Sequence, residues 1–179
     1  MIETTRLRLI PATIELVEAE IAGMEGLARS LGARVPENWP PDLLVDALPF
    51  FQEQLERHPE LAGWLSWYWV RWGEEQVLVG CGGFKGAPRP DGLVEIGYSV
   101  LPQFQGLGYA TEGVGGLVDW AFQTAEVARI IAETMPGNMA SLRLLEKLGF
   151  HPAGAGSEPG MVRWEVPGRG SAQPNPLDD

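Results

Sequence analysis

Cysteine is almost absent from this sequence, since Cys81 is the one cysteine among 179 residues. A lone cysteine excludes a disulfide within the chain, and on an expected strand it is typical of a small buried apolar residue. Histidine is nearly as scarce, because His58 and His151 are the two present. They are far apart in the sequence and each adjoins a proline, so surface or turn positions are expected and a metal-ligand cluster is not.

Long apolar runs and positive charge are also lacking. No apolar run reaches the length of a membrane span, and the first six residues lack the basic-then-apolar layout of a signal peptide. Thirteen basic residues against 24 acidic ones give a formal net charge of −11, which argues against a general nucleic-acid binder. We expect a cytoplasmic protein with no nucleic-acid or membrane partner, whose acidity serves solubility or steers a cationic amine.

The pattern of apolar residues predicts one α+β domain over residues 1–166. Helical spacing of apolar residues predicts helices over 13–31, 42–57, 108–124 and 138–148. Gly23 and Gly26 are expected to break the first of these into two short helices. Strands are expected over 5–10, 64–72, 76–84, 93–100, 129–134, 150–153 and 161–166. Tight turns make the strands from 64 to 100 three consecutive antiparallel strands. The polar, proline-rich segment 167–179 is expected to be a disordered tail.

The segment Trp64–Trp72 holds four tryptophans. Such a strand is more often core than substrate site, although its two aromatic faces leave an apolar acceptor surface open. The residues that shape an acceptor site are expected before Trp64 and in the loop 154–160.

One turn, Gln105–Ala110, has the features of an anion site. Gly106 and Gly108 permit backbone conformations and close approaches that a Cβ would block. The first N–H groups of the following helix have no internal partner and carry partial positive charge. The site therefore needs no lysine. A Walker A loop is excluded because no Gly-Lys-Ser/Thr triplet exists, and Thr111 stands where a dinucleotide fingerprint has its third glycine.

Gln105-x-x-Gly108-x-Ala110 matches the signature of the GNAT superfamily of N-acetyltransferases. The wider segments Glu95–Glu112, Asn138–Phe150 and Glu3–Leu9 resemble the branch that contains the ribosomal-protein N-terminal acetyltransferases. This resemblance covers the chain up to Val166, in the expected order.

The resemblance implies the GNAT fold, a mixed and mostly antiparallel central sheet flanked by helices. It implies that the strand Glu95–Val100 splays from its parallel neighbour Arg129–Thr134 and that the pantetheine arm of acetyl-CoA lies in the gap. The implied cofactor-binding residues are Ser99 and Val100 through their backbone, the N–H groups of the turn, and two residues of the later helix: Ser99, Val100, Gln105, Gly106, Gly108, Tyr109, Ala110, Asn138 and Ser141.

Acetyl transfer to an amine needs proton removal from the ammonium and reprotonation of the leaving thiolate. Glu95 is the candidate general base; the alternative is a solvated or sheet-stabilising carboxylate. Ser141 is the candidate acid, in the first turn of a helix capped by Asn138, and capping alone is the alternative. Many GNAT enzymes place a tyrosine on this helix, and this chain does not. Tyr98 is a further candidate for the site, and Glu112 is interpreted as structural.

We therefore predict an enzyme that moves an acetyl group from acetyl-CoA directly to a primary amine, without a metal. The amine belongs to a protein N-terminus or to a small molecule, and a homodimer is left open. A catalytically silent CoA-binding sensor of the same fold is the alternative, and a dinucleotide-dependent oxidoreductase is a weaker one.

Overall fold

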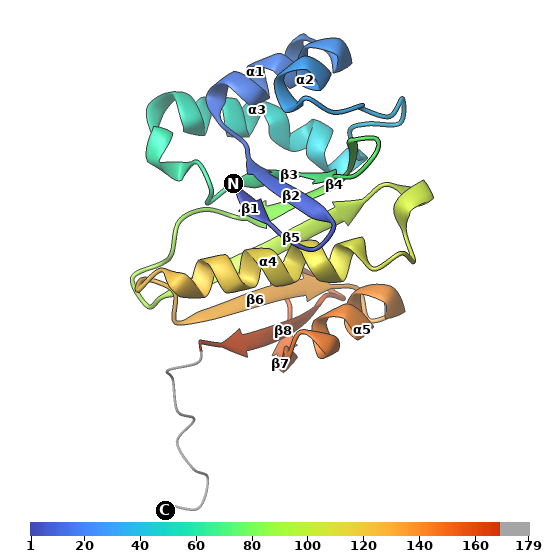
Figure 1. The fold of residues 1–179 in the computed structure, drawn as a ribbon. Helices are drawn as coiled ribbons and strands as arrows, with labels where there is room; N and C mark the ends of the chain where they lie inside the picture. Colours follow the sequence, from blue (N-terminus) through green and yellow to red (C-terminus); the bar gives the residue numbers. More distant parts are fainter. Residues whose placement is uncertain (169–179) are drawn as a thin grey trace, which may run out of the picture.

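The computed structural model describes residues 1–168, the side chains of residues 42 and 43 excepted. Its eight strands form one sheet in the order β1-β2-β3-β4-β5-β6-β8-β7 (Figure 1). The strands are β1 (Ile2–Glu3), β2 (Leu7–Pro11), β3 (Ser66–Arg71), β4 (Val77–Phe84), β5 (Leu93–Val100), β6 (Arg129–Thr134), β7 (His151–Ala155) and β8 (Val162–Pro167). The helices are α1 (Ile14–Ala22), α2 (Met24–Leu31), α3 (Asp42–Arg57), α4 (Tyr109–Gln123) and α5 (Met139–Lys147), with short 3-10 turns at Pro59–Leu61 and Pro102–Phe104.

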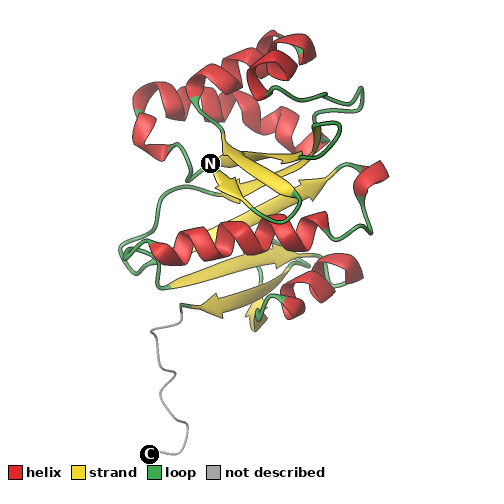
Figure 2. Ribbon diagram, in the orientation of Figure 1, coloured by secondary structure: helices red, strands yellow, loops and turns green. Residues whose placement is uncertain are grey.

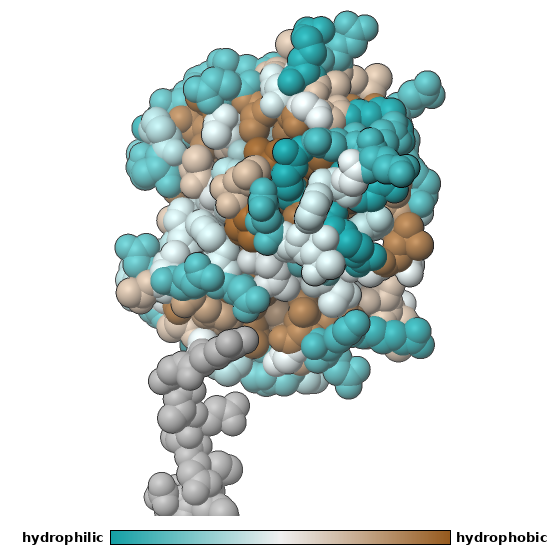
Figure 3. Space-filling model, viewed as in Figure 1, coloured by the Kyte–Doolittle hydropathy of each residue, from teal (hydrophilic) through white to brown (hydrophobic). Residues whose placement is uncertain are grey.

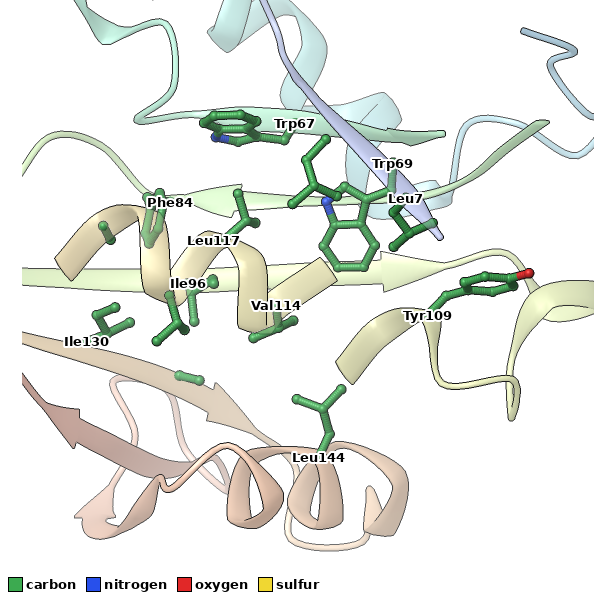
Figure 4. Packing of buried hydrophobic residues seen from close by; sticks show 14 of the residues in the cluster. Leu7, Trp67, Trp69, Phe84, Ile96, Tyr109, Val114, Leu117, Ile130 and Leu144 are labelled. Carbon is green, nitrogen blue, oxygen red and sulfur yellow. The ribbon is translucent and has the colours of Figure 1, made fainter. Parts of the chain in front are cut away.

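Helices cover both faces of this sheet, as Figure 2 shows. A core beneath α1, α2 and α3 contains Tyr68 and Val70 of β3, and a second core beneath α4 and α5 contains Trp67 and Trp69 of the same strand. Figure 4 shows Trp67 and Trp69 pointing toward the α4 side, near Leu117. The alternation follows from the period of two along a strand, and the prediction that the tryptophan-rich strand is core is confirmed.

The predicted helix signals at Gly23 and Asn138 are confirmed, and the predicted break at Gly26 is wrong. The first helical segment breaks at Gly23, whose φ of 132° suits glycine, whereas Gly26 lies inside α2. Asn138 caps α5 by accepting a hydrogen bond from the Ser141 N–H at 3.2 Å, and Gly149 follows with a φ of 83°. The first strand expected over 5–10 is β2, which ends one residue later, at Pro11.

The C-terminal segment predicted to be disordered lies outside the described residues, except for Pro167, which ends β8, and Gly168. No helix among residues 1–168 is long and apolar enough to cross a membrane. The face seen in Figure 3 is largely hydrophilic, and its hydrophobic residues form separate smaller patches.

The sheet opens between β5 and β6, and this opening positions the site. These two strands pair in parallel, whereas the other neighbouring pairs of the described sheet are antiparallel. The parallel pairing ends at Glu95 and Ile131, so residues 96–100 of β5 have no partner on β6. The predicted splayed pair is confirmed.

Candidate active site

The open part of β5 presents backbone groups that the sheet does not use. Backbone hydrogen bonds join Lys85 N–H to the Glu95 carbonyl and Leu101 N–H to the Val79 carbonyl. Because hydrogen-bonded residues alternate in an antiparallel ladder, the odd-numbered residues of β5 face β4 and the even-numbered ones face the gap. Tyr98 and Val100 therefore offer backbone groups to the gap, and Ser99 directs its own toward β4. The Val100 carbonyl already accepts a hydrogen bond from Gln105 Nε2 at 2.9 Å.

The glycine turn after β5 leads directly into α4. Gly106 and Gly108 have φ values of 73° and 84°, a left-handed region that favours glycine. Gly108 is the N-cap of α4, and no side chain caps this helix. Its first backbone N–H groups are therefore free to bind an anion, and the helix dipole adds partial positive charge.

A cluster of Thr4, Arg6 and Glu112 stabilises this turn through an ion pair and hydrogen bonds. Glu112 accepts hydrogen bonds from Thr4 Oγ1 and the Arg6 N–H at 2.6 Å each, and its other oxygen pairs with Arg6 Nε at 2.7 Å. Arg6 also donates to the Leu107 carbonyl at 2.9 Å. Burial alone would raise the pKa of Glu112, but bonds from Thr4 and Arg6 outweigh burial and lower it. The structural interpretation of Glu112 is confirmed, since its carboxylate is committed to these partners.

A cavity of about 500 Å³ lies between the glycine turn, the end of β5 and α5. We call it the α5-side cavity. All nine residues predicted to bind the cofactor line it: Ser99, Val100, Gln105, Gly106, Gly108, Tyr109, Ala110, Asn138 and Ser141. The tertiary fold thus brings the turn and the first turn of α5 together around one space.

Two cations that the sequence analysis passed over also line this cavity. Arg143 and Lys147 lie one helical turn apart on α5, on the face that also carries Ala140 and Leu144 to the cavity. The sequence analysis expected that the turn needs no lysine; the structure adds that α5 places positive charge beside the glycine turn. The i, i+4 spacing of these residues in the Asn138–Phe150 element was the available signal.

Tyr98 reaches Ser141 across the gap. Its phenol oxygen lies 2.7 Å from Ser141 Oγ, and both residues line the α5-side cavity. Burial raises the pKa of Tyr98, against a smaller opposing effect of the Ser141 hydrogen bond. The phenol is therefore protonated at neutral pH. The α5-side cavity thus has a tyrosine hydroxyl that comes from β5 rather than from α5.

Glu95 is placed differently from the other predicted residues. It forms an ion pair with Lys85 Nζ, its side chain is 12% exposed, and it lines neither of the two cavities described here. It does share a strand face with Gly97, two residues further along β5.

A second cavity, of about 490 Å³, lies on the opposite face of the sheet, and we call it the α3-side cavity. It is bounded by α3, by β4 and by the open part of β5, with these lining residues: Pro41, Leu44, Ala47, Phe50, Phe51, Leu65, Ser66, Cys81, Gly82, Gly83, Phe84, Lys85, Gly97, Tyr98 and Ser99. Tyr98 and Ser99 line both cavities. The α3 part of this lining precedes Trp64, as expected for an acceptor site, whereas residues 154–160 line neither cavity.

The Cys81 thiol forms part of this second wall. It is 6% exposed, and burial together with the charge of Glu20 raises its pKa to about 12. It is therefore a neutral, small apolar group at neutral pH, which confirms the interpretation of the lone cysteine as a buried residue rather than a nucleophile. Among residues 1–168 there is no group of three or more His, Cys, Asp or Glu placed to hold a metal ion.

The comparison with protein families agrees with this architecture. A model of the acetyltransferase (GNAT) domain matches residues 6–151, well over half of the chain. The chain belongs to the GNAT acetyltransferase family. This GNAT protein is therefore an enzyme of the N-acetyltransferase class, in agreement with the names of its relatives.

Relatives of known sequence and structure resemble this GNAT protein along most of its length. It is 33% identical over 150 residues to a Bacillus subtilis (strain 168) protein named uncharacterized N-acetyltransferase YjdG, which covers 84% of this chain and 89% of the relative. Ribosomal-protein-S5-alanine acetyltransferase from Vibrio fischeri shares its fold with a TM-score of 0.65 and 20% identity, covering 94% and 96% of the two chains. RimL, a ribosomal L7/L12 alpha-N-protein acetyltransferase solved with coenzyme A, shares the fold with a TM-score of 0.61 and 18% sequence identity. The match covers 92% of this chain and 95% of RimL.

Proposed function

We propose that this GNAT protein binds acetyl-CoA in the α5-side cavity and acetylates a primary amine that enters from the α3-side cavity. The observation that carries the proposal is the position of Tyr98 and Ser99, which line both cavities where β5 has no partner on β6. A group threaded through this opening would be in reach of a molecule on the other face of the sheet. Bound acetyl-CoA supplies an acetyl carbon whose bond to sulfur is exchanged for a bond to the amine nitrogen, with release of the CoA thiol.

The chain's own groups suit the parts of this cofactor. The first N–H groups of α4 and the side chains of Arg143 and Lys147 would hold its phosphates. The gap-facing backbone of Tyr98 and Val100 would pair with its amide-bearing arm, since such strand groups need partners. In this assignment the Ser99 backbone stays in the sheet, and Gln105 acts by fixing the Val100 carbonyl.

Proton transfer is assigned to the groups nearest the opening. The Tyr98 phenol, hydrogen-bonded to Ser141 Oγ, would donate a proton to the leaving thiolate. Among the described residues that line the two cavities, none is Asp, Glu or His. Glu95 would therefore take the amine proton through water, from its position two residues before Gly97 on the same strand face.

Ligand binding and turnover test this proposal separately. A thermal-shift experiment with acetyl-CoA, CoA and NAD should show stabilisation by the first two; a ligand at about 100 times its Kd adds about 2.7 kcal/mol. Stabilisation by NAD alone would contradict the assigned cofactor. Release of free thiol with a panel of amines then measures transfer. Binding of acetyl-CoA with no transfer to any amine would favour a silent CoA-binding sensor.

A further inference from the structure

The α3-side cavity differs in chemistry from the α5-side cavity. Its walls are mostly apolar, and α3 with its N-cap Pro41 contributes Leu44, Ala47, Phe50 and Phe51. Among the described residues that line it, none carries a carboxylate, and its one cation, Lys85, is paired with Glu95. A polycationic amine would have no anionic partner on these walls, despite the acidic composition of the whole chain.

Gly97 is an unusual residue for its position in β5. Its neighbour Ile96 is buried, but Gly97 is exposed to the α3-side cavity. Its φ does not lie in the left-handed region, and a Cβ built on it meets nothing within 4 Å. Neither the backbone nor packing against protein atoms requires glycine here. Glycine weakens a strand interior and often marks the close approach of a ligand.

The two other glycines of the same cavity are different. A Cβ at Gly83 would collide with the Leu65 carbonyl, and one at Gly82 would lie 2.5 Å from the Trp69 ring. Close packing of the sheet explains both of them. The empty space at Gly97 is instead a property of the cavity itself.

We propose that the α3-side cavity accepts a primary amine carried on an apolar body of one or two aromatic rings, and that Gly97 leaves the room for that body. This inference rests on the proposed acetyl transfer. The volume of about 490 Å³ suits a small organic molecule, and Phe50 and Phe51 offer ring faces and edges to an aromatic group. The shared opening at Tyr98 and Ser99 directs the amine toward the acetyl group.

Two source molecules carry this chemistry, a free arylalkylamine and a peptide that begins with phenylalanine. The test compares thiol release with 2-phenylethylamine, tryptamine and a Phe-initiated tetrapeptide against spermidine and a Ser-initiated tetrapeptide. We expect at least a 10-fold higher kcat/KM for one or more aromatic amines, and the peptide arm distinguishes the two sources. A preference for spermidine or for the Ser-initiated peptide would overturn the inference and leave the proposed acetyl transfer standing.

Substitution of Gly97 tests the cavity directly. Gly97→Val should reduce kcat/KM for the preferred aromatic amine about 10-fold or more. The kcat/KM for ethylamine should stay within about 3-fold of wild type, and the Kd of CoA should not change. Gly97→Ala should reduce the same kcat/KM by a smaller factor, and it keeps the test valid if the valine variant fails to fold. Gly115→Ala is the control, because its Cβ would make an ordinary 3.5 Å contact with Leu148. Equal losses for aromatic amine and ethylamine would overturn the inference.

Two exposed residues of α3 form a matched pair for a second test. Phe50 is 52% exposed and lines the cavity, whereas Val45 is 49% exposed and does not. Phe50→Ala should weaken use of the aromatic amine several-fold, and Val45→Ala should not. If no amine is turned over, calorimetry of tryptamine binding to CoA-loaded protein replaces the rate. Absence of that binding also overturns the inference, whereas failure to bind CoA refutes the proposed function instead.

Discussion

The pair formed by Tyr98 and Ser141 allows a quantitative test of the proton-transfer step. Replacing Tyr98 by Phe removes one oxygen and leaves the ring that packs against the core. The lost hydrogen bond, 2.7 Å long in a partly buried setting, should cost about 1 kcal/mol of unfolding free energy. Even if that whole 1 kcal/mol were lost from the transition state, the rate would fall only about 5-fold.

A general acid would have a much larger effect. Such a group contributes about 100- to 10,000-fold in rate, equivalent to roughly 3–5 kcal/mol of barrier. We expect Tyr98→Phe to lower kcat by at least about 100-fold while the Kd of CoA changes little. Because burial raises the pKa of Tyr98 above its ordinary value of 10.0, the neutral phenol persists through pH 9. Ionisation of Tyr98 should thus cause no loss of kcat up to pH 9.

The matched variant is Ser141→Ala, which leaves the phenol but removes its partner. If the two hydroxyls act as one unit, the double variant should be little worse than Tyr98→Phe alone, a coupling of roughly 0.5–3 kcal/mol. The assay is steady-state thiol release at saturating acetyl-CoA, with unfolding in urea as the measure of stability. A kcat for Tyr98→Phe within about 3-fold of wild type would refute the assignment of Tyr98 as the acid.

Three carboxylates give further predictions. Glu95→Gln should lower kcat about 100-fold or more and leave the affinity for CoA unchanged. The control is Lys85→Gln, which removes the ion pair but keeps the carboxylate. An equal loss of kcat in this control would show that the ion pair, and not a general base, explains the effect. Glu112→Gln should cost about 1–2 kcal/mol in urea unfolding and weaken CoA binding, since it releases the cluster behind the turn; unchanged values for both would contradict this role. Burial would raise the pKa of Glu133, but bonds from Ser157 and Arg163 lower it to about 2. The stability it contributes is therefore present above pH 4.5 and lost as the pH falls toward 2. In urea unfolding, the wild type should be more stable than Glu133→Gln by on the order of 1–2 kcal/mol at pH 7, and this difference should vanish near pH 2. A difference that stays constant with pH would refute the role of the Glu133 charge.

The sequence by itself determined the features that depend on a few consecutive residues. Gly106 and Gly108 impose the turn because their left-handed φ values suit glycine, and Asn138 caps α5 through a residue three positions away. The alternation in β3 likewise sorted Trp67 and Tyr68 to opposite faces. Such features follow from local backbone geometry and from strand and helix periods, so the helices, the strands and the glycine turn were predictable, whereas the GNAT fold was expected from the family resemblance.

Only the tertiary structure decided which distant groups meet. The register of β4 and β5 turns Tyr98, rather than Ser99, toward the gap, and the packing of α5 brings Ser141 to it from 43 residues away. The pairing of Glu95 with Lys85 and the empty space above Gly97 also depend on how strands and α3 are arranged. A one-residue change of strand register would move these side chains to the other face, so no local pattern can specify them.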